Sequence, residues 1–380
     1  MTGQDKKYMQ VALKLARRGI GSVEPNPSVG AVVVKANQVI GKGWHRKFGG
    51  PHAEINALQD CETLGVTPRG ATMYVTLEPC CHQAKTGPCT EAIIAAGVAK
   101  VVVATIDPSE HANGKGIEQL RNAGIEVETG ICEAQARLLN APFFKFAGTG
   151  KTWVILKWAQ SIDAKVAYAD TSRQLQWISG EQSRKDVHKL RRRVQAILVG
   201  INTVIADDPL LTARPDKGKK AARIVLDSRL RIPLDCRLLA TTKKAPVLIL
   251  TTQQTLRVNP QIVEKITKKG AEVLAYPEHY GSSNLHFLTC ELAKRDIAQL
   301  LVEGGPTVIA SFLREELVDQ IVVYIAPKIL GCSGSVPITE SMAALTEAVG
   351  LHHVEIERFG DDVRLTGLSK KTLDEISICP

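Results

Sequence analysis

The sequence predicts two α/β domains, each built on a largely parallel β-sheet with helices on its faces. Three observations support this fold class. The length of 380 residues suits two domains. Short apolar runs typical of strands alternate with helical patterns in both halves of the chain. The small residues Ala-Gly-Thr-Gly at 147–150 follow a predicted helix and place the domain boundary between residues 147 and 148.

The first domain, residues 1–147, begins with an amphipathic helix. Tyr8, Ala12 and Leu15 recur at helical spacing within residues 4–18. The apolar run 29–34 predicts a strand, which a turn at Ala36-Asn37 pairs with a second strand at residues 38–41. The remaining pattern predicts, in order, helix 53–64, strand 72–77, helix 90–96, strand 100–106, helix 116–123 and strand 125–128.

The second domain, residues 148–380, repeats the alternation with different spacing. No unit of about 20–50 residues recurs, which excludes a repeat protein. Apolar runs predict strands at residues 153–157, 196–199, 223–226, 247–250, 272–274, 299–302 and 320–325. Helical patterns predict helices at residues 183–193, 261–269, 292–295 and 307–315.

The composition excludes several classes of protein. With 44% hydrophobic and 23% charged residues, the chain matches a globular protein and not a disordered one. It has no run of about 18 apolar residues and no signal peptide, so we expect no membrane span. Nine cysteines, an odd number, argue against a disulfide framework. We therefore expect a cytoplasmic protein.

The net charge of +9 is spread over the chain, with an excess of +3 in residues 1–148 and +6 in residues 149–380. This distribution fits a small anionic ligand. The basic helix at residues 183–193 contains no aromatic residue, and aromatics make up only 4% of the chain. Nucleic-acid binding normally combines basic and aromatic side chains. We expect a phosphorylated small molecule as partner, no nucleic acid and no membrane, and a homo-oligomer.

A metal site is predicted where His52 opens a helix, Cys80 ends a strand and Cys89 precedes another helix. Imidazole and thiolate suit Zn²⁺, and three protein ligands leave a fourth position for water, the arrangement of a catalytic zinc. Cys81 or His82 could replace Cys89 as third ligand. Cys89 is preferred, because Cys81 adjoins Cys80 and would point the other way in a continuing strand.

Glu54 lies two residues after His52, placed to move protons between a zinc-activated water and a substrate nitrogen. His-x-Glu followed by Pro-Cys and a further Cys is typical of hydrolytic deaminases, which release ammonia from an amidine carbon. Eight residues, however, separate Cys80 from Cys89, where the general signature has two. Two alternatives are a nucleic-acid base deaminase with a basic auxiliary domain and a non-catalytic zinc-stabilised binding module.

The segments at residues 26–30, 52–54 and 78–89 resemble the deaminase half of the bifunctional deaminase–reductase family of riboflavin biosynthesis. In that family eight residues separate the second and third ligands. The resemblance implies a cytidine-deaminase-like three-layer αβα domain whose substrate is a diaminopyrimidinone with a phosphoribosylamino group. It implies zinc ligands at His52, Cys80 and Cys89, Glu54 as proton donor and Asn26 as a hydrogen-bonding partner of the pyrimidine.

The segments at residues 154–165, 177–178, 199–214 and 302–307 are similar to the reductase half of the same family. The resemblance implies a dihydrofolate-reductase-like domain that uses NADPH to reduce the ribosyl side chain to ribityl, giving 5-amino-6-(5-phosphoribitylamino)uracil. By family position, the NADPH contacts are Ala159, Trp177, Thr203, Asp207, Gly305, Pro306, Thr307, Val308, Ile309, Ala310 and Ser311. The substrate contacts are Leu175, Arg191, Leu211, Arg214 and Glu303, with Lys157 near the reacting ribose.

The residues themselves agree with parts of this assignment. The Gly304-Gly305 pair follows a predicted strand and opens a helix, so backbone N–H groups there can receive cofactor phosphates. Arginine side chains such as Arg191 and Arg214 can hold a phosphate bidentately. The chain departs from the family at Ala164, where glycine is common, and at Leu175, where serine is common. A hydroxyl contact to substrate is expected to be lost at Leu175.

Overall fold

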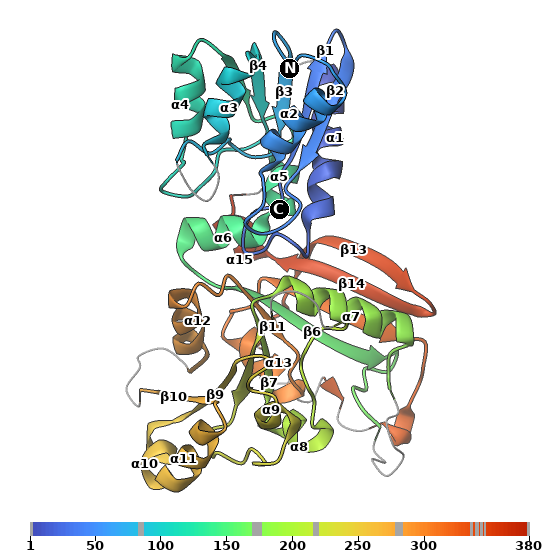
Figure 1. Cartoon of the computed structure of the whole chain (residues 1–380). Helices are drawn as coiled ribbons and strands as arrows, with labels where there is room; N and C mark the ends of the chain where they lie inside the picture. The colour runs from blue at the N-terminus through green and yellow to red at the C-terminus, as the bar shows by residue number, and fades with distance from the viewer. Residues whose placement is uncertain are drawn as a thin grey trace. The chain divides into compact units, whose positions relative to one another are not determined.

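The computed structural model describes residues 3–82, 87–168, 177–215, 220–277, 284–334, 337–338, 342, 345 and 347–377. These form two compact units (Figure 1). Unit 1 holds the described residues up to Gly150 together with Ile376 and Ser377, and unit 2 holds those from Lys151 to Glu375. The boundary predicted between residues 147 and 148 lies within helix α6 (Ala141–Thr149), shortly before this division.

Unit 1 contains a five-stranded sheet with the strand order β2-β1-β3-β4-β5. The prediction of a largely parallel sheet is correct only for β3, β4 and β5, because β1 runs antiparallel to both β2 and β3. The turn at Ala36 and Asn37, where φ is 49° and 62°, makes β1 and β2 a hairpin. The strands are β1 (Gly30–Lys35), β2 (Gln38–Trp44), β3 (Thr72–Val75), β4 (Lys100–Val103) and β5 (Glu126–Thr129).

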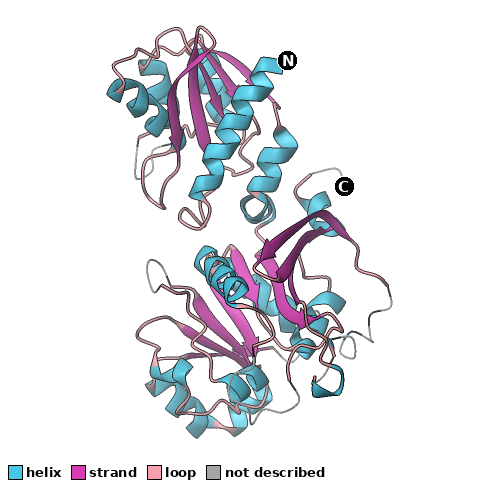
Figure 2. Ribbon diagram, turned by 90° about the vertical axis from the view of Figure 1, so that its right-hand side faces the viewer, coloured by secondary structure: helices cyan, strands magenta, loops and turns pink. Residues whose placement is uncertain are grey.

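Helices cover both faces of this sheet, which makes three layers (Figure 2). On one face, Val32 and Val34 of β1 pack against Met9 and Leu13 of α1 in a cluster that also includes Ala136 of α5. The opposite face carries α2. The helices of unit 1 are α1 (Gly3–Ala16), η1 (Arg17–Gly19), α2 (Ala53–Thr63), α3 (Cys89–Ala95), α4 (Lys115–Asn122), α5 (Glu133–Leu139) and α6.

Two glycines of β2 allow the backbone of α2 to lie directly on the sheet. A Cβ atom on Gly43 would collide with the backbone of Ala53 and Ala57, and one on Gly41 would collide with Ala57 and the Cys61 Sγ. Glycine is therefore required at both positions for this close approach. The same contact fixes where α2 begins, at the residue after His52.

Unit 2 contains a nine-stranded sheet with the order β10-β9-β8-β7-β11-β6-β12-β14-β13. The seven strands from β10 to β12 are parallel to their neighbours, as predicted, whereas β14 pairs antiparallel with β12 and β13. The strands are β6 (Trp153–Ser161), β7 (Ala196–Gly200), β8 (Ala222–Leu226), β9 (Val247–Thr252), β10 (Glu272–Tyr276), β11 (Gln299–Val302), β12 (Gln320–Ala326), β13 (Leu351–Phe359) and β14 (Asp362–Ser369).

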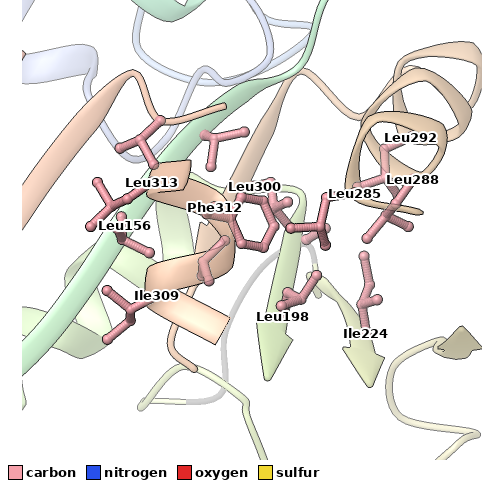
Figure 3. Close-up of a cluster of buried hydrophobic side chains, with 14 of the residues drawn as sticks. Leu156, Leu198, Ile224, Leu285, Leu288, Leu292, Leu300, Ile309, Phe312 and Leu313 are labelled. Carbon is pink, nitrogen blue, oxygen red and sulfur yellow. The ribbon is translucent and has the colours of Figure 1, made fainter. Parts of the chain in front are cut away.

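The core of unit 2 lies where two helices cover one face of the sheet (Figure 3). Leu288 of α12 and Phe312 of α13 pack against strand residues such as Leu198 and Leu300. On the other face, the Tyr324 hydroxyl of β12 donates a 2.7 Å hydrogen bond to Asp186 of α7. The helices are α7 (Glu181–Arg193), α8 (Ile201–Asp207), α9 (Arg237–Ala240), α10 (Gln253–Val258), α11 (Pro260–Lys268), α12 (Asn284–Lys294), α13 (Pro306–Arg314) and α15 (Lys370–Glu375).

Several elements of unit 2 differ from the sequence prediction. The helix predicted at residues 292–295 is only the end of α12, which begins at Asn284. The hairpin of β13 and β14 was not predicted, because most of β13 is exposed and carries charged residues in place of an apolar run. The short helix α8 was also missed. None of the helices in the described part of the chain is both long and apolar enough to cross a bilayer.

Replacing Gly43 by alanine should destabilise unit 1 by about 1–3 kcal/mol, the typical cost of overpacking, because the new Cβ collides with the backbone of α2. Thermal unfolding followed by circular dichroism measures the effect. Gly148→Ala is the matched control, since a Cβ there would meet only Pro108, at 3.9 Å. Identical unfolding of the two variants would contradict this account of the glycine contact.

Candidate functional site

Three sulfur and nitrogen ligands meet in unit 1. The Nδ1 atom of His52 lies 3.4 Å from the Sγ atoms of both Cys80 and Cys89. All three ligand atoms lie within 4.8 Å of one another, and no other group of three His, Cys, Asp or Glu side chains in the described residues does so. One imidazole and two thiolates at this spacing fit a zinc ion with a coordination position left open.

Two helix starts and a strand end bring these ligands together. His52 is the extended N-cap residue of α2, and Cys89 is the first residue of α3. Cys80 follows β3, and its sulfur accepts a hydrogen bond of 3.4 Å from the backbone N–H of Cys89. The Thr90 N–H donates to the carbonyl oxygen of Cys80 at 3.2 Å. The loop that carries Cys80 is thereby held against the first turn of α3.

The two cysteines differ in their affinity for protons. A hydrogen bond from Cys89, with further ones from His52 and a backbone N–H, lowers the pKa of Cys80. The same hydrogen bond to Cys80, together with burial, raises the pKa of Cys89. Zinc is bound by deprotonated thiols, so metal binding would release protons from this pair.

Glu54 faces this ligand set from the first turn of α2. Its side chain is buried and lies within hydrogen-bonding reach of the Cys89 sulfur. Burial raises the pKa of Glu54 to about 7, although the neighbouring His52 opposes the shift. A carboxyl group that gains and loses a proton near neutral pH is suited to general acid–base chemistry. The structure thus brings together the four residues of the predicted deaminase site.

Asn26 belongs to the same region, through a histidine that the sequence reasoning missed. The imidazoles of His45 and His52 pack edge to face with their centroids 5.3 Å apart. The Nδ1 of His45 lies 3.0 Å from the Pro51 carbonyl oxygen, and its Nε2 lies 3.5 Å from the Asn26 amide nitrogen. Burial lowers the pKa of His45 and favours the neutral ring. Because the side-chain amide nitrogen of Asn26 contacts His45, the side-chain carbonyl oxygen of Asn26 can accept a hydrogen bond from a ligand.

Glu78 holds the zinc-ligand loop to a second loop. Its buried carboxylate accepts hydrogen bonds from the backbone N–H groups of Gly114 and Gly116, at 2.9 and 2.8 Å. It also accepts a longer one, of 3.2 Å, from the Asp107 N–H. The sequence shows only an acidic residue before Pro-Cys, so nothing in it indicates these distant partners. Glu78 supports the site but does not point into the ligand set.

A second cluster of charged residues lies in unit 2. Glu303 follows β11 and is buried between Arg191 and Lys157. Arg191 donates to both carboxylate oxygens, from Nε at 2.6 Å and from Nη2 at 3.0 Å, and the Lys157 Nζ lies 3.3 Å from one of them. Although burial opposes ionisation, these two cations lower the pKa of Glu303 to about 2. Three predicted substrate residues therefore form one ion-pair network.

The loop after α8 joins this network through its backbone. Arg191 also donates from Nη1 to the Thr212 carbonyl oxygen, at 3.2 Å. Thr212 lies between the predicted substrate residues Leu211 and Arg214. Leu211 is buried with a left-handed backbone, at φ 51°, whereas Arg214 is exposed. Leu175, the remaining predicted substrate residue, lies outside the described residues.

Most of the predicted cofactor residues lie on two neighbouring helices. Helix α8, which carries Thr203 and ends at Asp207, begins after β7, and α13 begins after the adjacent strand β11. A Cβ on Gly200 would lie 2.9 Å from Val308, so the two helix starts are in close contact. A Cβ on Gly305 would meet nothing within 4 Å. This open backbone fits the phosphates of a dinucleotide, and the predicted residues 305–311 span it.

The other two cofactor candidates lie elsewhere in unit 2. Ala159 is in β6, where it is half-buried and opposite Tyr324 of β12. Trp177 is 54% exposed, and the guanidinium carbon of Arg184 lies 5.1 Å from its ring centroid. Nothing in the described contacts joins Trp177 to the two helix starts. The assignment of Trp177 to the cofactor remains a prediction from its family position.

The departure at Ala164 has a structural explanation. Its φ of 58° lies in the left-handed region, which glycine adopts without steric cost. Asp163 stabilises the same turn by accepting hydrogen bonds from the Ser161 hydroxyl at 2.6 Å and the Gly331 N–H at 2.8 Å. Ala164 therefore occupies a turn position that glycine would adopt at lower steric cost.

Comparisons with known proteins cover both units. The family model for the cytidine and deoxycytidylate deaminase zinc-binding region matches residues 2–105. The family model for the RibD C-terminal domain matches residues 152–365. The predicted fold class is confirmed, with a cytidine-deaminase-like α/β domain followed by a dihydrofolate-reductase-like α/β domain. The predicted zinc chemistry of the first domain is also confirmed.

Full-length relatives show the same two-domain arrangement. The riboflavin biosynthesis protein RibD of Aquifex aeolicus is 44% identical over 361 residues, which cover 94% of this chain and 97% of the relative. RibD of Escherichia coli is 39% identical over 376 residues, which cover 95% of this chain and 98% of the relative. The solved structure of Acinetobacter baumannii RibD matches with a TM-score of 0.80 at 37% identity, over 97% of this chain and 99% of that one.

A further similar solved structure is that of a diaminohydroxyphosphoribosylaminopyrimidine deaminase/5-amino-6-(5-phosphoribosylamino)uracil reductase from Thermotoga maritima. It matches with a TM-score of 0.80 at 33% identity, and the match covers 96% of this chain and 99% of that one.

Replacing Cys89 by serine should sharply reduce the zinc bound per chain, because a soft thiolate is exchanged for a hydroxyl group. Inductively coupled plasma mass spectrometry of the purified protein measures the metal. Cys81→Ser is the matched control and should retain zinc, because the Cys81 sulfur contacts the carbonyl oxygen of His111 at 3.8 Å. Zinc loss in the Cys81 variant alone would make Cys81 the third ligand.

Proposed function

The chain belongs to the RibD family of riboflavin-biosynthesis proteins, and on this basis we propose how its two sites divide the reaction. The protein is a bifunctional enzyme with a zinc-dependent deaminase activity and a reductase activity. Unit 1 deaminates 2,5-diamino-6-(5-phosphoribosylamino)pyrimidin-4(3H)-one. Unit 2 then reduces the ribosyl side chain with NADPH and gives 5-amino-6-(5-phosphoribitylamino)uracil. The paired activities of the Thermotoga maritima relative support this order.

The observation that carries the deaminase proposal is the meeting of His52, Cys80 and Cys89 beside the buried carboxyl of Glu54. Zinc held by these ligands would supply Lewis-acid activation of a water for attack on the amidine carbon. Glu54 is placed to accept a proton from the attacking water and to pass it to the leaving nitrogen, so that the bond from carbon to that nitrogen breaks and ammonia departs. Asn26, oriented by His45, accepts a hydrogen bond from the pyrimidine.

The reductase proposal depends on the ion-pair network of unit 2. NADPH supplies a hydride, and the bare backbone at the start of α13 supports binding of its phosphates. The ion pair with Glu303 fixes the position of the Lys157 side chain, so that Lys157 can hold a hydroxyl of the ribose while the ring opens. Arg214, exposed on its loop, binds the substrate phosphate.

We also propose that the enzyme works in the cytoplasm as a homo-oligomer. The seven cysteines whose side chains are described are all unpaired, which supports a reducing compartment. Strand β13 is the outer strand of its sheet, and its Val354 and Ile356 are 46% and 68% exposed. A long exposed edge with apolar residues supports coverage by a second copy of the chain.

The test supplies the diaminopyrimidinone phosphoriboside together with NADPH and follows ammonia release and NADPH oxidation separately. Both signals are expected, with ammonia release first. A second reaction supplied with the deaminated intermediate should oxidise NADPH without releasing ammonia. Failure of either signal with the zinc-loaded enzyme would refute the corresponding half of the proposal.

In this assay Glu54→Gln should retain zinc but release ammonia about 10²–10⁴ times more slowly, the usual contribution of a general acid–base residue. Glu62→Gln, an exposed position at the end of the same helix, is the matched control and should behave as wild type. Zinc content and initial rates are measured on the same samples. Ammonia release by Glu54→Gln near the wild-type rate would dismiss Glu54 as the proton carrier.

Arg214→Ala should raise the KM of the reductase for the deaminated intermediate about tenfold, because a charge-assisted hydrogen bond to phosphate is lost. Ammonia release by unit 1 should not change. Arg314→Ala, in the last turn of α13, is an exposed control in the same unit. If the Arg214 variant lowered both activities together, the assignment of separate sites would be wrong.

A further inference from the structure

Helix α4 contacts both segments that carry the cysteine ligands, although the proposed function gives it no role. At the start of α4, backbone N–H groups meet the side chain of Glu78, two residues before Cys80. In the middle of the helix, Gln119 contacts Thr90, the residue after Cys89. Helix α4 therefore joins two parts of the ligand set that a loop separates in the sequence.

Glu78 satisfies N–H groups that the first turn of α4 leaves without a partner inside the helix. Its carboxylate accepts hydrogen bonds from the N–H groups of Gly114 at 2.9 Å, Gly116 at 2.8 Å and Ile117 at 3.4 Å. The side chain is only 4% exposed, so these N–H groups and the positive end of the helix dipole stabilise its negative charge in place of water. The carboxylate is thereby fixed to the start of α4.

A close backbone contact holds the same segment against the helix. A Cβ on Gly116 would collide with the carbonyl oxygen of Pro79 and would lie 3.1 Å from the Glu78 Oε1. Glycine is therefore required at the second residue of α4 for this approach. The chain immediately before Cys80 lies directly on the start of the helix.

Thr90 connects the middle of α4 to both cysteine segments. Its side chain is fully buried, and its hydroxyl donates a 2.8 Å hydrogen bond to the Oε1 of Gln119. The same hydroxyl lies 3.3 Å from the Cys80 carbonyl oxygen, which also accepts the Thr90 N–H at 3.2 Å. Thr90 therefore ties Cys80 to the first turn of α3, and Gln119 fixes the orientation of the Thr90 side chain.

We propose that Glu78 and Gln119 are positioning residues of the deaminase metal site, which use α4 to set the distance between Cys80 and Cys89. The inference rests on the proposed ligand set of His52, Cys80 and Cys89. A tetrahedral zinc ion needs its two sulfur ligands at a fixed separation, so a shift of either cysteine segment weakens metal binding. Both positioning residues act through the backbone or through Thr90 and need no contact with the metal or the substrate.

The first experiment measures the Kd for zinc in the full-length protein by competition with a chromophoric chelator. Glu78→Gln keeps the size of the side chain but removes its charge and turns an amide NH2 group towards backbone N–H donors. Its Kd for zinc should rise about 10- to 100-fold, the usual effect of losing a group that orients metal ligands. Glu118→Gln, exposed in the first turn of the same helix, is the matched control and should bind zinc as the wild type does.

A pair of variants at Gln119 tests the second contact. Gln119→Ala removes the acceptor of the Thr90 hydroxyl and should raise the Kd for zinc about fivefold, the equivalent of one hydrogen bond. Gln119→Glu keeps an oxygen acceptor and should restore the wild-type Kd. Equal Kd values for the two variants would contradict the role of Gln119. This pair decides the proposal if Glu78→Gln does not fold.

Substitution of Co²⁺ for zinc separates positioning from a loss of stability. Co²⁺ absorbs visible light according to the arrangement of its ligands, whereas the filled d shell of Zn²⁺ does not. With saturating Co²⁺, Glu78→Gln should show shifted absorption bands, while the circular dichroism of its metal-free form matches that of the wild type. Wild-type bands and a wild-type Kd in both Glu78→Gln and Gln119→Ala would overturn the inference. Absence of zinc binding by the wild type, or full retention of zinc by Cys89→Ser, would instead refute the proposed ligand set.

Discussion

Parallel strands bring their carboxyl ends to one edge of a sheet, and both sites depend on this constraint. In unit 1 the strand β3 leads into Cys80, and α3 begins at Cys89. In unit 2 the neighbouring strands β7 and β11 lead into the starts of α8 and α13. Helix starts at this edge provide free N–H groups and the positive end of a dipole. The same property favours thiolates in unit 1 and would favour cofactor phosphates at the proposed site in unit 2.

The two units stabilise buried charge in different ways. In unit 1 hydrogen bonds from Cys89, from His52 and from a backbone N–H stabilise the thiolate of Cys80. In unit 2 Glu303 is balanced by Arg191 and Lys157 without any ligand. Because the pKa of Glu303 is lowered to about 2, its stabilising contribution is fully present above its unfolded pKa near 4.5 and is lost as the pH falls towards 2. The reductase site is therefore preorganised.

The sequence predicted the local features well and the long-range ones poorly. The hairpin at Ala36-Asn37 and the ligand set around His52 depend on short motifs, and both were recognised. Arg191 was assigned to the phosphate because nothing in a single sequence shows that its guanidinium pairs with Glu303, 112 residues away. His45 was missed for the same reason, since its contacts with Asn26 and His52 form only in the folded chain. The exposed strand β13 lacks the apolar run by which strands are recognised.

The exposure of Arg214 has a kinetic consequence. A buried cation paired with a carboxylate, such as Arg191, contributes little field outside the protein, whereas an exposed one acts at a distance through water. If Arg214 binds the substrate phosphate as proposed, the encounter begins at this residue, and salt at physiological strength screens that attraction over about 8 Å. The rate of substrate capture should then fall as ionic strength rises. The buried network of Arg191, Lys157 and Glu303 is shielded from the same ions.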